Sequence, residues 1–291
     1  ISFVMQMAAT ELFPERKLRI RHTLGSGFYA EFDGGVVPTA EELNQLKARM
    51  TDVVERDLKI TRRKRLSEEV AEEYARYGFD DRLDLVETRP HLYRTVNYLG
   101  DMPGYFYGAL APSSSYVPRF DIAPYYNGFY VALPERSCPE HVTTAIHLDK
   151  MFDIFHEYQQ WIDIMGVPTV GDLNRRVMEG DASELIKIAE AFHENKIASI
   201  ARSIAKANEE RGVRMALISG PSSSGKTTFS KRLGIQLRVL GLDPVLIALD
   251  DYFVDRERTP LDENGKPDFE ALEAIDLETL NDHLRRLSAG E

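Results

Sequence analysis

The stretch that decides the fold of the C-terminal third reads Gly220-Pro221-Ser222-Ser223-Ser224-Gly225-Lys226-Thr227-Thr228. It fits the pattern G-x-x-x-x-G-K-[ST], in which a glycine-rich loop wraps backbone N–H groups around a polyanion at a helix N-terminus. Glycines at both ends of the loop allow the backbone to approach phosphates closely. Lys226 offers an ammonium group to the β- and γ-phosphates, and Thr227 offers a hydroxyl to Mg²⁺. The loop therefore predicts a site that binds ATP together with Mg²⁺.

The residues around this loop favour the order strand, loop, helix. An apolar run at 215–218 predicts a buried strand, and apolar residues at helical spacing predict a helix over 227–240. A second apolar run at 245–249 predicts another buried strand, which ends in Asp250 and Asp251. Ligands of open α/β sheets bind at the carboxyl ends of the strands, so we expect Asp250 to face the phosphates. Asp251 is the alternative, because successive side chains of a strand alternate in direction.

Composition describes an ordinary globular protein and excludes several classes. The chain has 291 residues, of which 43% are hydrophobic and 29% charged, and its net charge is −11. This charge disfavours general nucleic-acid binding, although the run Arg62-Arg63-Lys64-Arg65 is a local exception. We interpret that run as a solvated helix entrance, with RNA contact as the alternative. Cys138 is the single cysteine, and no apolar stretch approaches the 18 or so residues of a membrane span, so we expect a cytoplasmic protein.

The ends of the chain indicate an excerpt of a longer protein. The sequence starts at Ile1 inside what reads as an amphipathic helix. It stops at Glu291, about 80 residues into a nucleotide-binding unit that usually needs five or so parallel strands. We therefore expect the fragment to be inactive alone, and any activity to belong to the parent.

The C-terminal segment resembles the uridine kinase and phosphoribulokinase family of P-loop kinases. The matching blocks stand in family order at 220–228, 249–253 and 268–276. The resemblance implies Lys226 and Asp250 as catalytic residues, with Asp250 and Thr227 at the metal. It also implies a nucleoside-binding role for Asp250 and three further residues, Tyr252, Phe253 and Glu270. Core packing is the alternative for the two aromatic residues.

Together these features predict an ATP-dependent nucleoside kinase that phosphorylates the 5′-hydroxyl of uridine or cytidine. Lys226 would neutralise the triphosphate, and Asp250 would accept the proton of the acceptor hydroxyl. Two alternatives stay open. One is a nucleotide-dependent protein that senses RNA or another ligand, and the other is a kinase for a different alcohol, such as a sugar phosphate or a pantothenate-like compound.

The N-terminal segment over 1–135 resembles the editing domain shared by threonyl- and alanyl-tRNA synthetases. The resemblance is carried by residues 11–14, which read Glu-Leu-Phe-Pro, and by residues 20–33 with their Gly-Phe-Tyr core. The family binds a metal through a His-x-x-x-His pair and a Cys-x-x-x-His pair. Here the second helical histidine aligns near Phe3, and the later loop at 108–115 holds neither ligand. We expect a domain without metal ligands or editing chemistry, with a tRNA-like ligand as a partner and Ser113-Ser114-Ser115 as a polar loop.

Periodicity completes the expected fold. Alternating Phe28, Ala30 and Phe32 predict a strand with one buried face, and the stretch 41–56 predicts a helix that starts after Thr39. A helical connector is expected over 136–211, with helices at 147–165 and from 181 onward. The predicted class is thus an α+β N-terminal domain over 1–135, this connector, and the start of an α/β P-loop parallel sheet over 212–291.

Overall fold

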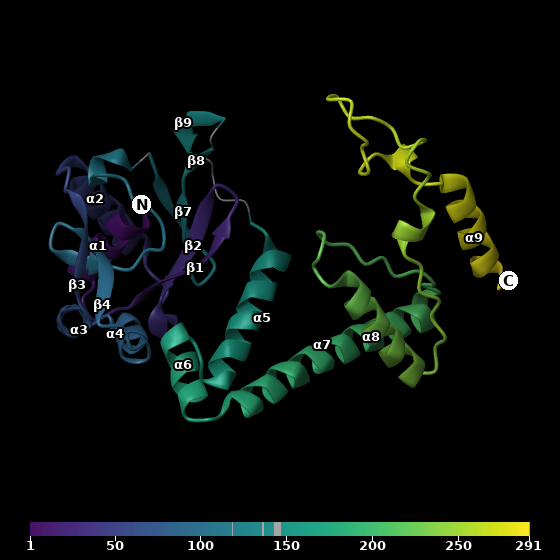
Figure 1. Cartoon of the computed structure of the whole chain (residues 1–291), viewed down its shortest axis with the longest axis horizontal. Coiled ribbons are helices and arrows are strands. Elements are labelled where there is room, and N and C mark those ends of the chain that lie inside the picture. Colours follow the sequence, from purple (N-terminus) through teal and green to yellow (C-terminus); the bar gives the residue numbers. More distant parts are fainter. Residues whose placement is uncertain (118, 136, 143–146, 291) are drawn as a thin grey trace. The chain divides into compact units, whose positions relative to one another are not determined.

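The chain forms two compact units, Ile1–Leu185 and Ile186–Glu291 (Figure 1). The structure is a computed structural model that describes residues 1–117, 119–135, 137–142 and 147–290. Each unit has its own cluster of buried apolar side chains. The domain boundaries that the sequence suggests after residues 135 and 211 stay predictions.

Antiparallel sheets dominate the first unit. A four-stranded sheet has the order β1-β2-β7-β6, and a three-stranded sheet has the order β3-β4-β5. The strands of the larger sheet are β1 (Leu18–Leu24), β2 (Gly27–Phe32), β6 (Asp121–Tyr125) and β7 (Gly128–Ala132). Those of the smaller sheet are β3 (Ile60–Leu66), β4 (Tyr93–Leu99) and β5 (Met102–Gly104). A two-stranded hairpin follows, formed by β8 (Pro134–Glu135) and β9 (Cys138–Val142). This mixed architecture agrees with the expected α+β class.

Helices supply the rest of the core of this unit. They are α1 (Ser2–Leu12), α2 (Ala40–Glu55), α3 (Ser67–Arg76), α4 (Asp80–Glu87), α5 (Asp149–Met165) and α6 (Val170–Met178), with short 3₁₀ turns η1 (Asp33–Gly35) and η2 (Ser114–Tyr116). The main core joins apolar residues of α1, α2 and α3 to those of β2, β4 and β7. Helix α2 begins as the sequence predicts. The Thr39 hydroxyl oxygen accepts a hydrogen bond from the Glu42 amide, and the Glu42 carboxylate accepts one from the Thr39 amide.

Strand β2 differs from its prediction, because it is buried on both faces. Phe28, Ala30 and Phe32 face the main core as expected. Tyr29 points the other way and is only 3% exposed. Its ring packs edge-on against Phe152 of α5, with the ring centroids 5.5 Å apart. Helix α5 therefore covers the face that alternation alone assigns to solvent.

The second unit is built on helices. Its main elements are α7 (Ala182–Arg211, which begins in the first unit), α8 (Lys226–Val239), α9 (Leu277–Ala289) and the short 3₁₀ turns η3 (Leu249–Tyr252) and η4 (Leu272–Ala274). The core is small: Ile197 and Ala201 of α7 pack with Leu233 and Leu237 of α8. Among the described residues, no helix is long and apolar enough to span a membrane.

The expected start of a parallel sheet is not found. Residues 215–218 and 245–249 form no strand among the described residues, and Leu217 and Val245 are 87% and 65% exposed. A parallel strand needs a neighbouring strand for its backbone hydrogen bonds and helices over both faces. These two segments have neither in the described part of the chain, which explains why apolar sequence alone does not make them strands.

Candidate functional site

The loop at 220–228 closes around its own lysine. The Lys226 Nζ donates to the carbonyl oxygens of Gly220 and Pro221, each at 2.9 Å. Gly225 has φ +85°, and a Cβ at Gly220 would lie 2.9 Å from the Ser224 Oγ. The loop is thus wound tightly where glycine is required. No described side chain caps the N-terminus of α8, so its first amide groups are available to an anion.

The other predicted nucleotide-site residues lie further along this unit. Asp250 lies with Asp251 in η3, and both side chains are exposed. The Tyr252 hydroxyl hydrogen-bonds to the Nδ1 of His283 in α9 at 2.9 Å. Within the described residues, no hydrogen bond or ion pair joins Asp250 to residues 220–228.

Phe253 and Glu270 also make local contacts. The Phe253 ring packs edge-on against Phe269, with centroids 6.3 Å apart, as the packing alternative expects. Glu270 is exposed, and its backbone amide donates to the Asp268 side chain. The ligand roles of Tyr252, Phe253 and Glu270 therefore stay predictions.

In the first unit, the positions where the editing family holds metal ligands carry structural side chains. Phe3 is 4% exposed and packs on Phe106, with ring centroids 4.9 Å apart. Ser114 is fully buried, where its hydroxyl donates to the Val53 carbonyl and accepts from the Leu58 amide. In the described parts of the chain, no group of three or more His, Cys, Asp or Glu side chains could hold a metal ion.

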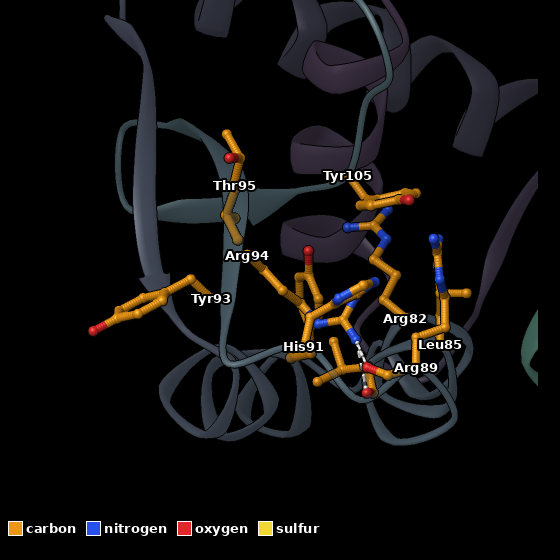
Figure 2. Close-up of a pocket in the computed structure, with 11 residues that line it drawn as sticks. Arg82, Leu85, Arg89, His91, Tyr93, Arg94, Thr95 and Tyr105 are labelled. Atoms are coloured by element: carbon orange, nitrogen blue, oxygen red, sulfur yellow. Dashed lines mark hydrogen bonds between the residues drawn. The ribbon is translucent and has the colours of Figure 1, made fainter.

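A pocket of about 200 Å³ lies beside α4 and β4 (Figure 2). Its lining is cationic, and it comes from α3, α4, β4, the segment between α4 and β4, and the residue that follows β5. The residues around it are Tyr74, Arg82, Leu85, Val86, Arg89, His91, Tyr93, Arg94, Thr95, Val96 and Tyr105. Sequence reasoning missed this set, because its members are separated along the chain and belong to no motif. The only sequence signal is the concentration of arginines and aromatic residues over 82–105.

Neutral groups accept the hydrogen bonds of two arginines of this pocket, Arg82 and Arg94. Arg82 donates to the Gln6 side chain at 3.2 Å and to the Pro103 carbonyl at 3.3 Å. Arg94 donates to the backbone carbonyls of Val86 and Arg89. Burial lowers the pKa of Arg82 from its ordinary value, and it lowers that of Arg94 with a further contribution from the nearby charge of Arg89.

The cationic run at 62–65 lies in strand β3, which leads directly into helix α3 at Ser67. The run therefore precedes a helix, as expected from sequence, but is itself extended. In the three-stranded sheet β3 pairs only with β4, so it is an edge strand. Arg62, Arg63 and Lys64 are exposed. The Lys64 ammonium lies 4.8 Å from the ring centroid of Tyr93, which is itself half exposed. The strand thus presents cations beside an accessible aromatic ring.

Part of the chain is similar in sequence to one group of known proteins, the threonine–tRNA ligases. The chain is 26% identical over 149 residues to the threonine–tRNA ligase of Geobacter sp. (strain M21), covering 51% of this chain and 23% of the relative. It is 30% identical over 119 residues to the threonine–tRNA ligase of Pelobacter propionicus, covering 41% of this chain and 19% of the relative. It is 36% identical over 87 residues to the threonine–tRNA ligase of Symbiobacterium thermophilum, covering 30% of this chain and 13% of the relative. The chain therefore spans less than a quarter of the length of these relatives, and no family model matches it.

These similarities support a tRNA-synthetase-like domain, as the editing-domain resemblance implies. They also show that the predicted uridine kinase-like enzyme is wrong, because the relatives are ligases of tRNA. The phosphoribulokinase-family assignment and the kinase alternatives with other alcohol acceptors are wrong for the same reason, and a nucleoside acceptor has no support. A loop motif of nine residues indicates phosphate binding, but it does not specify which reaction the bound phosphates undergo.

Proposed function

We propose that the unit Ile1–Leu185 binds a tRNA-like ligand and does not hydrolyse it. The observation that carries the proposal is the cationic edge strand β3 beside Tyr93, in a chain similar to threonine–tRNA ligases. The net charge of −11 repels nucleic acid in general, so binding must depend on a local surface.

The chemistry of this surface suits RNA. Arg62 and Lys64 project from an exposed strand, where their charges can release counterions from phosphates. Tyr93 is 50% exposed, and an accessible aromatic ring can stack on an unpaired base. Hydrolysis is not part of the proposal, because a buried Phe3 stands near the position of a metal-binding histidine in the editing family.

Fluorescence anisotropy with labelled tRNA transcripts tests the proposal. The double variant Arg62→Gln/Lys64→Gln should weaken binding. The plot of log K against log salt concentration should also become less steep by roughly 2, because each lost phosphate contact reduces the magnitude of its slope by about 0.9. The control Arg76→Gln/Lys150→Gln removes the same charge from exposed positions on α3 and α5. Equal affinities and equal slopes in both double variants would contradict the proposed surface.

We also propose that residues 220–228 bind the phosphates of a nucleoside triphosphate such as ATP. The closed loop, the Lys226 ammonium and the uncapped start of α8 support this site. The backbone amides of Gly220 and of residues 222–228 would surround the phosphates, with Pro221, which lacks an N–H group, shaping the loop. Thr227 and Asp250 would hold Mg²⁺, which supplies positive charge to the phosphate oxygens.

Binding of a fluorescent ATP analogue tests this second proposal. Lys226→Ala should lower the affinity roughly tenfold or more, because it removes a charge-assisted contact. Lys231→Ala is the matched control, since Lys231 is an exposed lysine on the same helix. If both variants bind the analogue as the parent does, this loop is not the nucleotide site.

A further inference from the structure

The arginines of the α4–β4 pocket lack the carboxylate partners that other arginines of this unit have. Arg19 pairs with Asp33 at 2.9 Å, and Arg65 pairs with Glu69 at 2.9 Å. Within the described residues, none of the pocket arginines at 82, 89 and 94 forms an ion pair. The adjacent carboxylate, Asp81, forms its ion pair with Arg19 at 3.1 Å, and its charge acts on Arg82 only from beyond ion-pair distance.

The hydrogen-bonding capacity of these arginines is also incompletely used. The Arg94 Nε is buried and has no hydrogen-bond partner among the described residues. Leaving a buried donor of a charged group unpaired is costly, and most such groups in native proteins are paired. Both Arg82 and Arg94 place their charge against neutral carbonyl and amide oxygens, which do not neutralise it. The pocket therefore holds positive charge that an incoming anion would compensate.

Guanidinium groups favour a particular kind of anion. Their planar fork matches the two oxygens of a carboxylate or a phosphate, and such charge-assisted pairs are about twice as strong as neutral hydrogen bonds. Arg82 comes from α4, Arg94 comes from β4, and Arg89 comes from the segment between them (Figure 2). An oxyanion inside the pocket could thus be approached from several sides.

Size restricts the ligand further. The pocket volume of about 200 Å³ is below the roughly 300–1,000 Å³ of sites that hold drug-sized ligands. Leu85, Val86 and Tyr105 supply apolar surface for a short carbon chain. The base and ribose of a nucleotide would exceed this volume and would have to extend out of the pocket.

We propose that the α4–β4 pocket binds a small organic oxyanion, a phosphate monoester or carboxylate of a few carbon atoms, which is held by Arg82, Arg89 and Arg94. The pocket shares Tyr93 with the proposed RNA surface at β3. The RNA test changes Arg62 and Lys64, whereas the test of this pocket changes Arg89, so one proposal can fail without the other.

Isothermal titration at constant ionic strength tests the site, with glycerol phosphate and citrate as probes. The titrations use the full chain carrying Lys226→Ala, so that the loop at 220–228 contributes little. Arg89→Met should weaken binding of the better probe roughly tenfold, the loss expected for one charge-assisted contact. Arg89 is exposed, so this variant should keep the fold that a change of Arg94 could disturb. Arg76→Met is the control, because it removes an equivalent exposed arginine outside the pocket.

The outcomes are distinct. Tenfold weaker binding in Arg89→Met, with Arg76→Met within twofold of the parent, supports the site. Equal binding in both variants, or no binding of either probe to the parent, overturns it. Adenosine monophosphate and a 5′-phosphorylated RNA oligonucleotide serve as larger competitors. If either displaces the small probe as effectively as unlabelled probe does, the size argument is wrong and the ligand is a nucleotide.

Discussion

The close approach of strands β2 and β7 makes Gly27 the most informative position for a stability test. A Cβ built at Gly27 would lie 2.1 Å from the Val131 carbonyl oxygen and 2.6 Å from the Tyr130 ring, whereas ordinary contacts begin at 3.4 Å. The two strands would have to separate by about 1.3 Å, which the dense interior resists. Strand β7 cannot move freely, because it also pairs with β6.

The expected cost of Gly27→Ala follows from this geometry. Overpacking costs about 1–3 kcal/mol, and weakening one or two ladder hydrogen bonds adds about 1 kcal/mol each. We expect the free energy of unfolding of the first unit to fall by about 3 kcal/mol. Gly108→Ala is the control: a Cβ at Gly108 would meet nothing within 4 Å, so stability should stay equal or rise by up to about 1 kcal/mol.

Urea unfolding followed by tryptophan fluorescence measures this difference. Trp161 is the single tryptophan of the chain and lies in α5, so its signal reports the unit Ile1–Leu185. A midpoint for Gly27→Ala equal to that of Gly108→Ala would refute the reasoning, because it would mean that β2 and β7 do not approach as closely as the structure shows.

Three further outcomes can be checked with the same fluorescence signal. Thr39→Ala should lower the free energy of unfolding by about 1 kcal/mol, because it removes the N-cap of α2, and an unchanged midpoint would argue against the cap. Ser114→Ala should lower the free energy of unfolding by roughly 2 kcal/mol or more, because the Leu58 amide and the Val53 carbonyl lose their buried partner. An unchanged free energy of unfolding would mean that the hydroxyl is solvated and not buried. Burial raises the pKa of Tyr74 from 10.0 to about 12, so the stability that its neutral phenol contributes is complete below pH 10 and is lost as the pH rises toward 12. Tyr74→Phe should flatten the decline of the melting temperature across that window, and identical pH profiles would contradict the assigned cause.

Sequence patterns located local structure well. The position of Thr39 predicted the start of α2, and the helix expected over 147–165 is α5, which ends at a left-handed Gly166. These features depend on side chains within a few residues of each other, so the local sequence contains the necessary information. The loop at 220–228 belongs to the same class, because its winding follows from its own glycines and lysine.

Sequence patterns failed where structure depends on distant partners. The apolar runs at 215–218 and 245–249 resemble buried strands, but a strand also requires a neighbour. The kinase assignment failed for a related reason, since a phosphate-binding loop is shared by proteins with different chemistry. The Arg62–Arg65 run does precede helix α3, but its place in a strand depends on pairing with β4, 30 or so residues away, which is invisible to local periodicity.

The sequence by itself determined the start of α2, the position of α5 and the winding of the loop at 220–228. Tertiary structure alone decided that α5 buries the second face of β2, that β3 is an edge strand, and that three arginines, which form no ion pair among the described residues, share one pocket. The physical reason is the range of the interactions involved. Caps and tight loops are made by neighbours along the chain, whereas burial and charge compensation depend on which distant segments fold against each other.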